Sequence, residues 1–164
     1  TDFDIISECG ANPKKIIIVS SAPQIRYPDC YGIDMAKIDN FIVFKATLKL
    51  LEDRNILEQT LESIYSKCKL NQDYPIEKVE NCVRALYDPF SNEQISAKIA
   101  QMLKGNNIKA KVEVIFQTIE GLHKACPKNL GDWYFSGDYP TPGGNRVVNR
   151  AFMNFYEGKS VRAY

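Results

Sequence analysis

The sequence predicts an α/β protein in which a parallel sheet is combined with a helical insertion and a C-terminal helix. Two strand-like segments, residues 15–21 and 111–117, flank a long stretch, 39–103, whose apolar residues recur at helical spacing. The first segment follows a helical pattern and a short turn, a succession typical of a parallel α/β unit. Its nearly continuous apolar character favours a strand covered on both faces.

The chain begins with a predicted short helix over residues 2–9. Gly10 stands where a left-handed helix cap belongs, and the proline three residues later stops the helix. The strand over 15–21 then runs into the loop of residues 22–38, which two prolines stiffen and in which Gly32 permits a turn. Loops after parallel strands are where α/β proteins place binding residues, so this loop is the first candidate site.

Four short amphipathic helices are predicted between residues 39 and 105. Asp39 is a plausible N-cap of the first, and the second follows it directly. The third starts behind Pro75 and continues to the break at Asp88-Pro89. Ser91-Asn92-Glu93-Gln94 is a capping box that opens the fourth. Helical stripes of this kind are more often core than partner-binding grooves.

The last third of the chain is predicted as strand, helix, loop and helix. Residues 111–117 alternate as a strand, and Thr118 can cap a helix that ends at Cys126-Pro127. Residues 127–145 read as a loop, although its Trp, Tyr and Phe side chains need something to pack against. A closing helix is predicted over 145–157.

Length and composition are those of one globular domain with a real core. Hydrophobic residues make up 45% of the 164 residues, and 21 Lys and Arg face 20 Asp and Glu. Without a basic stripe, no nucleic-acid partner is expected. The apolar runs are too short for a bilayer and no signal peptide is visible, so we expect no membrane partner and a cytoplasmic location. The chain starts at Thr1 without a methionine, and we expect it to be a piece of a longer polypeptide.

The cysteines are widely spaced and do not form a metal-binding pattern. They are Cys9, Cys30, Cys68, Cys82 and Cys126. Zinc would need close pairs of Cys or His, and His123 is the only histidine. An odd number of cysteines without a secretory signal indicates free thiols, most of which we expect to be small buried hydrophobic side chains.

Few residues offer catalytic chemistry by themselves. His123 has no acidic or nucleophilic neighbour one helical turn away and is interpreted as a packing or surface histidine. Ser20 and Ser21 could contact a ligand or could bond to the loop backbone. Asp34 could bind a cation, but a turn cap is the simpler interpretation. The Gly-Gly-Asn-Arg sequence at 143–146 could open an anion-binding helix, but a plain turn fits it better. The sequence holds no P-loop or dinucleotide fingerprint.

Three stretches resemble the glutamine amidophosphoribosyltransferase family. In "SSAPQIRYPDCYGIDM" (20–35), the residues that match the family are Ser20, Pro23, Arg26, Pro28, Tyr31, Gly32, Ile33 and Asp34. "VIFQTIEGLHKA" (114–125) is similar to the family's last sheet strand and following helix, and "FSGDYPT" (135–141) to its C-terminal motif. The helical middle is longer than in typical members and resembles the helix-expanded form of the Bacteroides group.

The resemblance implies the later half of a type I phosphoribosyltransferase-like parallel-sheet domain. Residues 1–38 are then an α/β element with its loop, 39–105 a helical insertion, and 106–164 the last strand, its helix and a C-terminal extension. The implied nucleotide or interface loop consists of Ser20, Ser21, Arg26, Pro28, Tyr31, Gly32 and Asp34.

The loop offers the groups that nucleotide binding needs. Arg26 can reach a phosphate with two N–H groups, and Tyr27 and Tyr31 offer stacking faces. The alternative is that Arg26 pairs with a nearby carboxylate and that the tyrosines only pack.

The family's catalytic groups are implied to lie outside this chain. They are a carboxylate pair, an Arg-Gly-Thr phosphate loop and a glutaminase domain with a cysteine nucleophile, all of which precede this strand in the family. We therefore expect no catalytic residue here and no activity of this chain alone. The parent is expected to use glutamine, phosphoribosyl pyrophosphate and magnesium, to respond to purine nucleotides and to form a homo-oligomer.

Some members of the family hold an iron–sulfur cluster. The cysteines that hold it correspond to Asp29, Gly131 and Tyr134 here, and Cys30 is displaced by one residue. Because such clusters generally need four anchoring sulfurs, we predict no cluster and no other metal in this chain.

Two functions follow from these observations. The leading hypothesis is an enzyme that transfers glutamine-derived ammonia to phosphoribosyl pyrophosphate, of which this chain is an inactive part. The alternative is a non-catalytic nucleotide-binding or subunit-interface module derived from a phosphoribosyltransferase.

Overall fold

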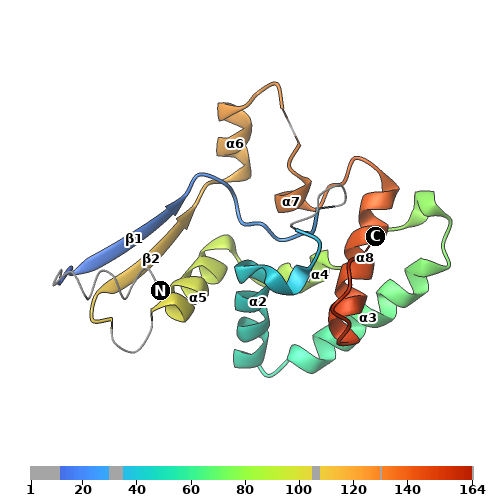
Figure 1. Ribbon diagram of the computed structural model, residues 1–164, viewed down its shortest axis with the longest axis horizontal. Helices are drawn as coiled ribbons and strands as arrows, with labels where there is room; N and C mark the ends of the chain where they lie inside the picture. Colours follow the sequence, from blue (N-terminus) through green and yellow to red (C-terminus); the bar gives the residue numbers. More distant parts are fainter. Residues whose placement is uncertain (1–11, 30–34, 105–107, 130, 164) are drawn as a thin grey trace.

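The computed structural model describes residues 12–29, 35–104, 108–129 and 131–163. The predicted helix over 2–9 lies outside these residues. The elements in chain order are β1 (Lys15–Ser20), the 3-10 turn η1 (Ile38–Asn40), α2 (Ile42–Asp53), α3 (Leu57–Gln72), the 3-10 turn η2 (Ile76–Lys78), α4 (Arg84–Tyr87), α5 (Asn92–Leu103), β2 (Lys111–Phe116), α6 (Ile119–Ala125), α7 (Trp133–Ser136) and α8 (Pro142–Tyr156). In Figure 1 the two strands lie side by side at one end, α3 and α8 lie toward the other, and α2 is between them.

The two strands pair in parallel, which confirms an α/β fold with a parallel sheet. Their register runs from Lys15 opposite Lys111 to Ser20 opposite Phe116, and the described residues form no third strand. β2 turns Val112 and Val114 into the core, where α5 packs against it.

The prediction that β1 is covered on both faces is wrong for the described residues. Ile17 and Val19 are 50% and 69% exposed, and Ile115 beside Val19 is 43% exposed. Residues 16–19 are all apolar, as the prediction assumed. Within the described part of the chain, however, a helix packs against only one face of the sheet.

Three of the four predicted insertion helices are present. α2 begins at Ile42 and not at Asp39, because the preceding residues form the 3-10 turn η1. The capping box of α5 is complete: the Ser91 hydroxyl accepts from the Gln94 N–H, and the Gln94 side chain accepts from the Ser91 N–H. Helix propensity and capping residues were sufficient to predict these three helices, because both agree with how the helices pack.

The predicted third helix is wrong. A single turn, η2, is followed by extended backbone and the short α4. Side chains from α8 take the backbone groups that a helix would use: Asn145 donates to the Val79 carbonyl at 2.9 Å, and Asn149 donates to the Glu80 carbonyl at 2.8 Å. Asn149 also accepts from the Cys82 N–H at 3.0 Å. Because these groups are satisfied from outside, the segment of residues 79–82 does not become helical.

The last third follows the prediction with two differences. Thr118 caps α6 by accepting from the Gly121 N–H at 2.9 Å. The aromatic stretch predicted as loop contains the short helix α7, and α8 starts at Pro142, three residues earlier than predicted. Proline fits the first turn of a helix, where its missing N–H has no partner to lose. No helix of the described ranges combines the length and the apolar character that a bilayer span requires.

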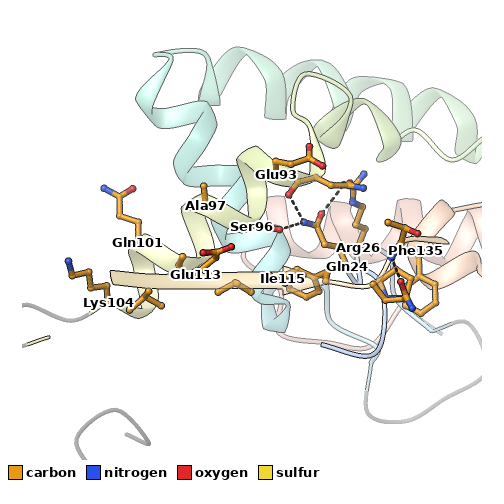
Figure 2. Close-up of a pocket in the computed structure, with 18 of the residues that line it drawn as sticks. Gln24, Arg26, Glu93, Ser96, Ala97, Gln101, Lys104, Glu113, Ile115 and Phe135 are labelled. Atoms are coloured by element: carbon orange, nitrogen blue, oxygen red, sulfur yellow. Dashed lines mark hydrogen bonds between the residues drawn. The ribbon is translucent and has the colours of Figure 1, made fainter. Parts of the chain in front are cut away.

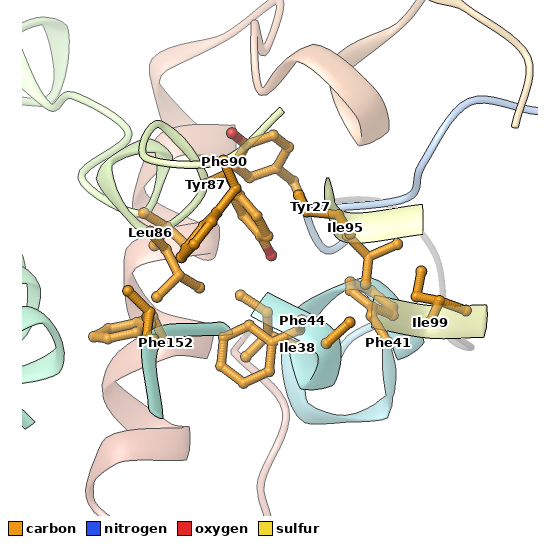
Figure 3. Close-up of a cluster of buried hydrophobic side chains, with 14 of the residues drawn as sticks. Tyr27, Ile38, Phe41, Phe44, Leu86, Tyr87, Phe90, Ile95, Ile99 and Phe152 are labelled. Carbon is orange, nitrogen blue, oxygen red and sulfur yellow. The ribbon is translucent and has the colours of Figure 1, made fainter. Parts of the chain in front are cut away.

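One hydrophobic core joins the loop after β1, the helical segment and the C-terminal helix. Figure 3 shows Tyr27, Phe44, Tyr87 and Phe152 around its centre. Phe44 and Phe152 are completely buried, and Tyr27 is 3% exposed. The helical segment therefore shares its core with the residues before and after it, while the boundaries predicted at 38/39 and 105/106 stay predictions.

Candidate functional site

A cavity of about 800 Å³ lies where β2, α5 and the loop after β1 meet. Figure 2 shows its lining, which includes Gln24, Arg26, Ser96, Lys104, Ile115 and Phe135. The lining combines an apolar strip from β2 with amide, hydroxyl and cationic groups. A volume and lining of this kind suit a small-molecule ligand.

Gln24 fixes the loop to the start of α5. Its side chain is 4% exposed, and Nε2 donates to the Asn92 carbonyl at 2.8 Å and to Ser96 Oγ at 3.1 Å. Its Oε1 accepts from Arg26 Nη2 at 2.8 Å. Both ends of this buried amide are thus hydrogen-bonded, as a buried polar group requires.

Arg26 is held at one corner of its guanidinium. Nη2 donates to Gln24 Oε1 and, at 2.5 Å, to Asn92 Oδ1, while the group lies 5.3 Å from the centre of the Tyr87 ring. Within the described ranges, no carboxylate pairs with Arg26, and its Nε and Nη1 make no hydrogen bond. The alternative that Arg26 pairs with a carboxylate is not found among the described residues, where its hydrogen-bond partners are the neutral amide oxygens of Gln24 and Asn92. The positive charge remains available to an anion in the cavity.

The backbone of the loop is fixed from three sides. The N–H groups of Arg26 and Tyr27 both donate to the Tyr134 carbonyl, at 2.9 and 3.1 Å. The Tyr87 hydroxyl donates to the Arg26 carbonyl at 2.7 Å, and the Tyr139 hydroxyl donates to the Pro28 carbonyl. Arg26 is therefore preorganised by α7 and α4 as well as by α5.

Tyr27 is a packing residue and not a stacking face. It meets the Tyr87 ring edge-on, with 5.5 Å between the ring centres. Burial raises the pKa of Tyr27 to about 12 and raises that of Tyr87 well above its usual value. Both hydroxyls therefore stay protonated at neutral pH. Tyr31, Gly32 and Asp34 lie outside the described residues.

The serines and Pro28 do not join Arg26 at the cavity. Ser20 Oγ donates to the Ala22 carbonyl at 3.0 Å and accepts from the Ala22 N–H at 3.3 Å, which agrees with the interpretation of backbone bonding. Ser21 is exposed, Pro28 is buried, and none of the three lines the cavity. Of the described members of the implied nucleotide or interface loop, only Arg26 lines the cavity, while Pro23, which also matches the family, lies beside it in the lining.

The charge balance of the cavity favours anions. Lys104, Lys109 and Lys111 line it together with Arg26, against Glu93 and Glu113. Glu113 is already paired with Lys15 at 2.5 Å, and this hydrogen bond lowers the pKa of the Glu113 carboxyl. The remaining positive excess attracts a negatively charged ligand.

His123 has an acidic neighbour that its sequence position does not reveal. Its Nε2 lies 3.1 Å from Asp132 Oδ2, outside hydrogen-bond alignment, and Ser136 Oγ donates to Asp132 Oδ1 at 2.8 Å. The serine contacts the carboxylate and not the histidine, so this is not a nucleophile with its base. The contacts among His123, Asp132 and Ser136 therefore join α6 to α7.

The Gly-Gly-Asn-Arg sequence follows Pro142 directly and lies in the first turn of α8. A Cβ on Gly144 would come within 2.4 Å of the Tyr139 ring, so the glycine is required for close packing. The Asn145 amide is taken by the Val79 carbonyl. The plain turn expected at these residues is therefore wrong, because they form the start of α8, and no observation tests anion binding there.

The positions that correspond to cluster cysteines have structural contacts. The Asp29 N–H donates to the Met35 carbonyl, Gly131 lies against the Trp133 ring, and the Tyr134 carbonyl holds the loop. Among the described residues, no group of three His, Cys, Asp or Glu side chains could hold a metal ion. The absence of an iron–sulfur cluster stays a prediction.

Sequence reasoning missed the residues that position Arg26. Gln24 stands two residues before Arg26 in the quoted stretch, so attention to its polar side chain on the same side of an extended chain could have identified it. Asn92 and Ser96 come from α5, and no spacing in the sequence connects them to the loop.

Comparison with known proteins places the chain near one class of transferases. No family model and no solved structure matches it. Among curated proteins it is similar to the amidophosphoribosyltransferase of Saccharomyces cerevisiae, with 25% identity over 118 residues. The match covers 68% of this chain and 23% of the yeast protein, so the chain corresponds to less than a quarter of that relative. The relation is distant.

Proposed function

We propose that this chain is part of a glutamine amidophosphoribosyltransferase, which transfers glutamine-derived ammonia to phosphoribosyl pyrophosphate to give phosphoribosylamine for purine synthesis. The similarity to the yeast enzyme supports this class. The role of the chain rests on the geometry of Arg26. Gln24 and Asn92 fix its guanidinium at Nη2, and its remaining N–H groups stay available at the cationic cavity that it lines. The chain alone is inactive, because it lacks the family's catalytic motifs.

Arg26 binds an anionic group of the substrate or of a regulatory purine nucleotide in the whole enzyme. A guanidinium can bind two phosphate oxygens side by side, and Phe135 and the β2 side chains supply an apolar wall. Magnesium enters this proposal only with phosphoribosyl pyrophosphate. Of the two cavity carboxylates, Glu113 is already paired with Lys15.

The test is Arg26→Ala in the full-length protein, with turnover of phosphoribosyl pyrophosphate measured with and without AMP or GMP. Losing one charge-assisted contact to phosphate should weaken substrate or nucleotide binding by about 10- to 100-fold. Arg162→Ala is the matched control, since Arg162 is exposed and its guanidinium forms no hydrogen bond or ion pair with the described residues. The 164-residue chain, assayed beside it, should show no turnover.

Two results decide between the hypotheses. A full-length wild-type protein without turnover, but with nucleotide binding that Arg26→Ala abolishes, supports the non-catalytic module. Turnover and inhibition that are both unchanged in Arg26→Ala leave the loop a structural element and contradict its proposed role.

A further inference from the structure

Two of the five cysteines form a pair. Cys68 lies on α3 and Cys82 just before α4, and 13 residues separate them in the sequence. Asn71, one turn after Cys68 on α3, accepts from the Glu80 N–H at 3.0 Å, so the segment that carries Cys82 lies against α3, where the two thiol side chains meet. Cys68 is completely buried, whereas Cys82 is partly exposed. The pair therefore has one thiol that solvent can reach and one thiol behind it.

The surroundings hold Cys82 in place. Its N–H donates to Asn149 Oδ1 at 3.0 Å, and the Asn149 amide also binds the Glu80 carbonyl. Asn149 and Cys68 line the same small cavity of about 180 Å³. The side chains of α3 and α8 thus fix the segment that carries Cys82 beside Cys68.

The two thiols differ in acidity: the partly exposed Cys82 has the lower pKa and the buried Cys68 the higher one. The hydrogen bond from Cys68 lowers the pKa of Cys82 and outweighs partial burial and the charge of Glu80, which raise it; the charge of Lys67 adds to the lowering. The same contact and burial raise the pKa of Cys68. The accessible thiol is therefore the more nucleophilic one, as in thiols that react with oxidants.

We propose that Cys82 and Cys68 are a modification site for hydroperoxides and small-molecule disulfides, at which Cys82 reacts first and Cys68 closes an intramolecular disulfide. With hydrogen peroxide, the Cys82 sulfur attacks one oxygen and the O–O bond breaks. The products are Cys82 sulfenic acid and water. The Cys68 sulfur then displaces the sulfenic hydroxyl, which leaves with the Cys68 proton as a second water.

A small disulfide reacts by exchange at the same two sulfurs. Cys82 forms a mixed disulfide and releases one thiol, and Cys68 displaces the second. In both routes the two cysteines are oxidised by two electrons and the reagent is reduced by two.

The cross-link fastens α3 to the segment of residues 79–82. That segment is not helical and is held on its other side by Asn145 and Asn149 of α8. A disulfide here closes a short loop and restricts the unfolded chain. Oxidation should therefore raise the thermal midpoint by roughly 6–12 °C in a domain of this size.

The experiment exposes the reduced, purified protein to hydrogen peroxide or to oxidised glutathione, followed by alkylation of the remaining thiols and peptide mapping. We expect a Cys68–Cys82 cross-linked peptide, a loss of two hydrogen atoms in mass and a higher thermal midpoint. Cys82→Ser should abolish both reactions at this site. Cys126→Ser is the matched control, because Cys126 is an exposed thiol at the end of α6, and should leave the cross-link unchanged.

Cys68→Ala separates the two steps, since Cys82 should then stop at sulfenic acid or at a stable mixed disulfide with glutathione. Peptide mapping of the wild-type protein decides the proposal even if a variant fails to fold. Cys82 that is modified without ever linking to Cys68, or disulfides only between other cysteines, would overturn it.

Discussion

Tyr27 lies where the loop after β1 enters the core, directly beside the site residue Arg26. Its ring packs against Tyr87 while its backbone N–H donates to Tyr134. One residue thus anchors the loop through both its main chain and its side chain. Burial favours the neutral hydroxyl, and the pKa of Tyr27 rises to about 12 in the folded protein.

This pKa predicts a loss of stability in alkali. The folded state holds the Tyr27 proton more tightly than the unfolded state, so its contribution is complete below pH 10 and is lost as the pH rises toward about 12. At about 1.4 kcal/mol for each pH unit, the loss is about 3 kcal/mol. Urea unfolding of wild type and Tyr27→Phe between pH 9 and pH 12 should show a shallower decline for the variant. Parallel declines would contradict the assignment.

At the scale of elements, α5 links the fold to the site. Its capping box fixes the first turn, and that turn contains Asn92, which accepts from Arg26, and leads to Ser96, which accepts from Gln24. A change at the cap therefore acts on helix stability and on the position of Arg26 together.

Ser91→Ala should lower the free energy of unfolding by about 1 kcal/mol, because the Gln94 N–H loses its partner. Ser63→Ala in α3 is the control: Ser63 is exposed inside a helix, so the substitution should be neutral or slightly stabilising. Chemical denaturation measures both. A variant Ser91→Ala as stable as wild type would mean that water replaces the cap.

The elements also show what the sequence could and could not predict. Periodicity and capping residues predicted both strands, α3, α5 and α6, because local preference and packing agree there. The prediction of the third helix was wrong because Asn145 and Asn149, far along the chain, bind the backbone of residues 79–82. Arg26 was a predicted site residue, but its partners on α5 became visible only through the tertiary contact.

For the whole molecule, the shared core implies one cooperative unit. Tyr27, Phe44, Tyr87 and Phe152 belong to one cluster although they come from the start, middle and end of the chain. The His123–Asp132 contact joins α6 to α7, and α7 meets that unit through the Tyr134 carbonyl, which accepts from the Arg26 and Tyr27 N–H groups, and the Ser136 carbonyl, which accepts from Arg84 at 3.0 Å.

We expect a single unfolding transition. The fluorescence of Trp133, the only tryptophan, reports on α7, while far-UV circular dichroism reports mainly on the helices of residues 39–105. Coincident midpoints in urea would confirm cooperativity, because a common core cannot be lost in parts. A separate, earlier fluorescence transition would show that the α6–α7 region unfolds by itself.

The parallel pairing of β1 with β2 has a consequence for synthesis on the ribosome. Lys15 is made long before its partner Lys111, and the whole helical segment lies between them. At about 5–20 residues per second, β1 waits roughly 5–20 s for β2 to be synthesised. During that time Ile16–Val19 lacks its partner β2 and is an apolar segment of the kind that chaperones bind. The high sequence separation of this contact makes strand docking a late event, after the helices have formed.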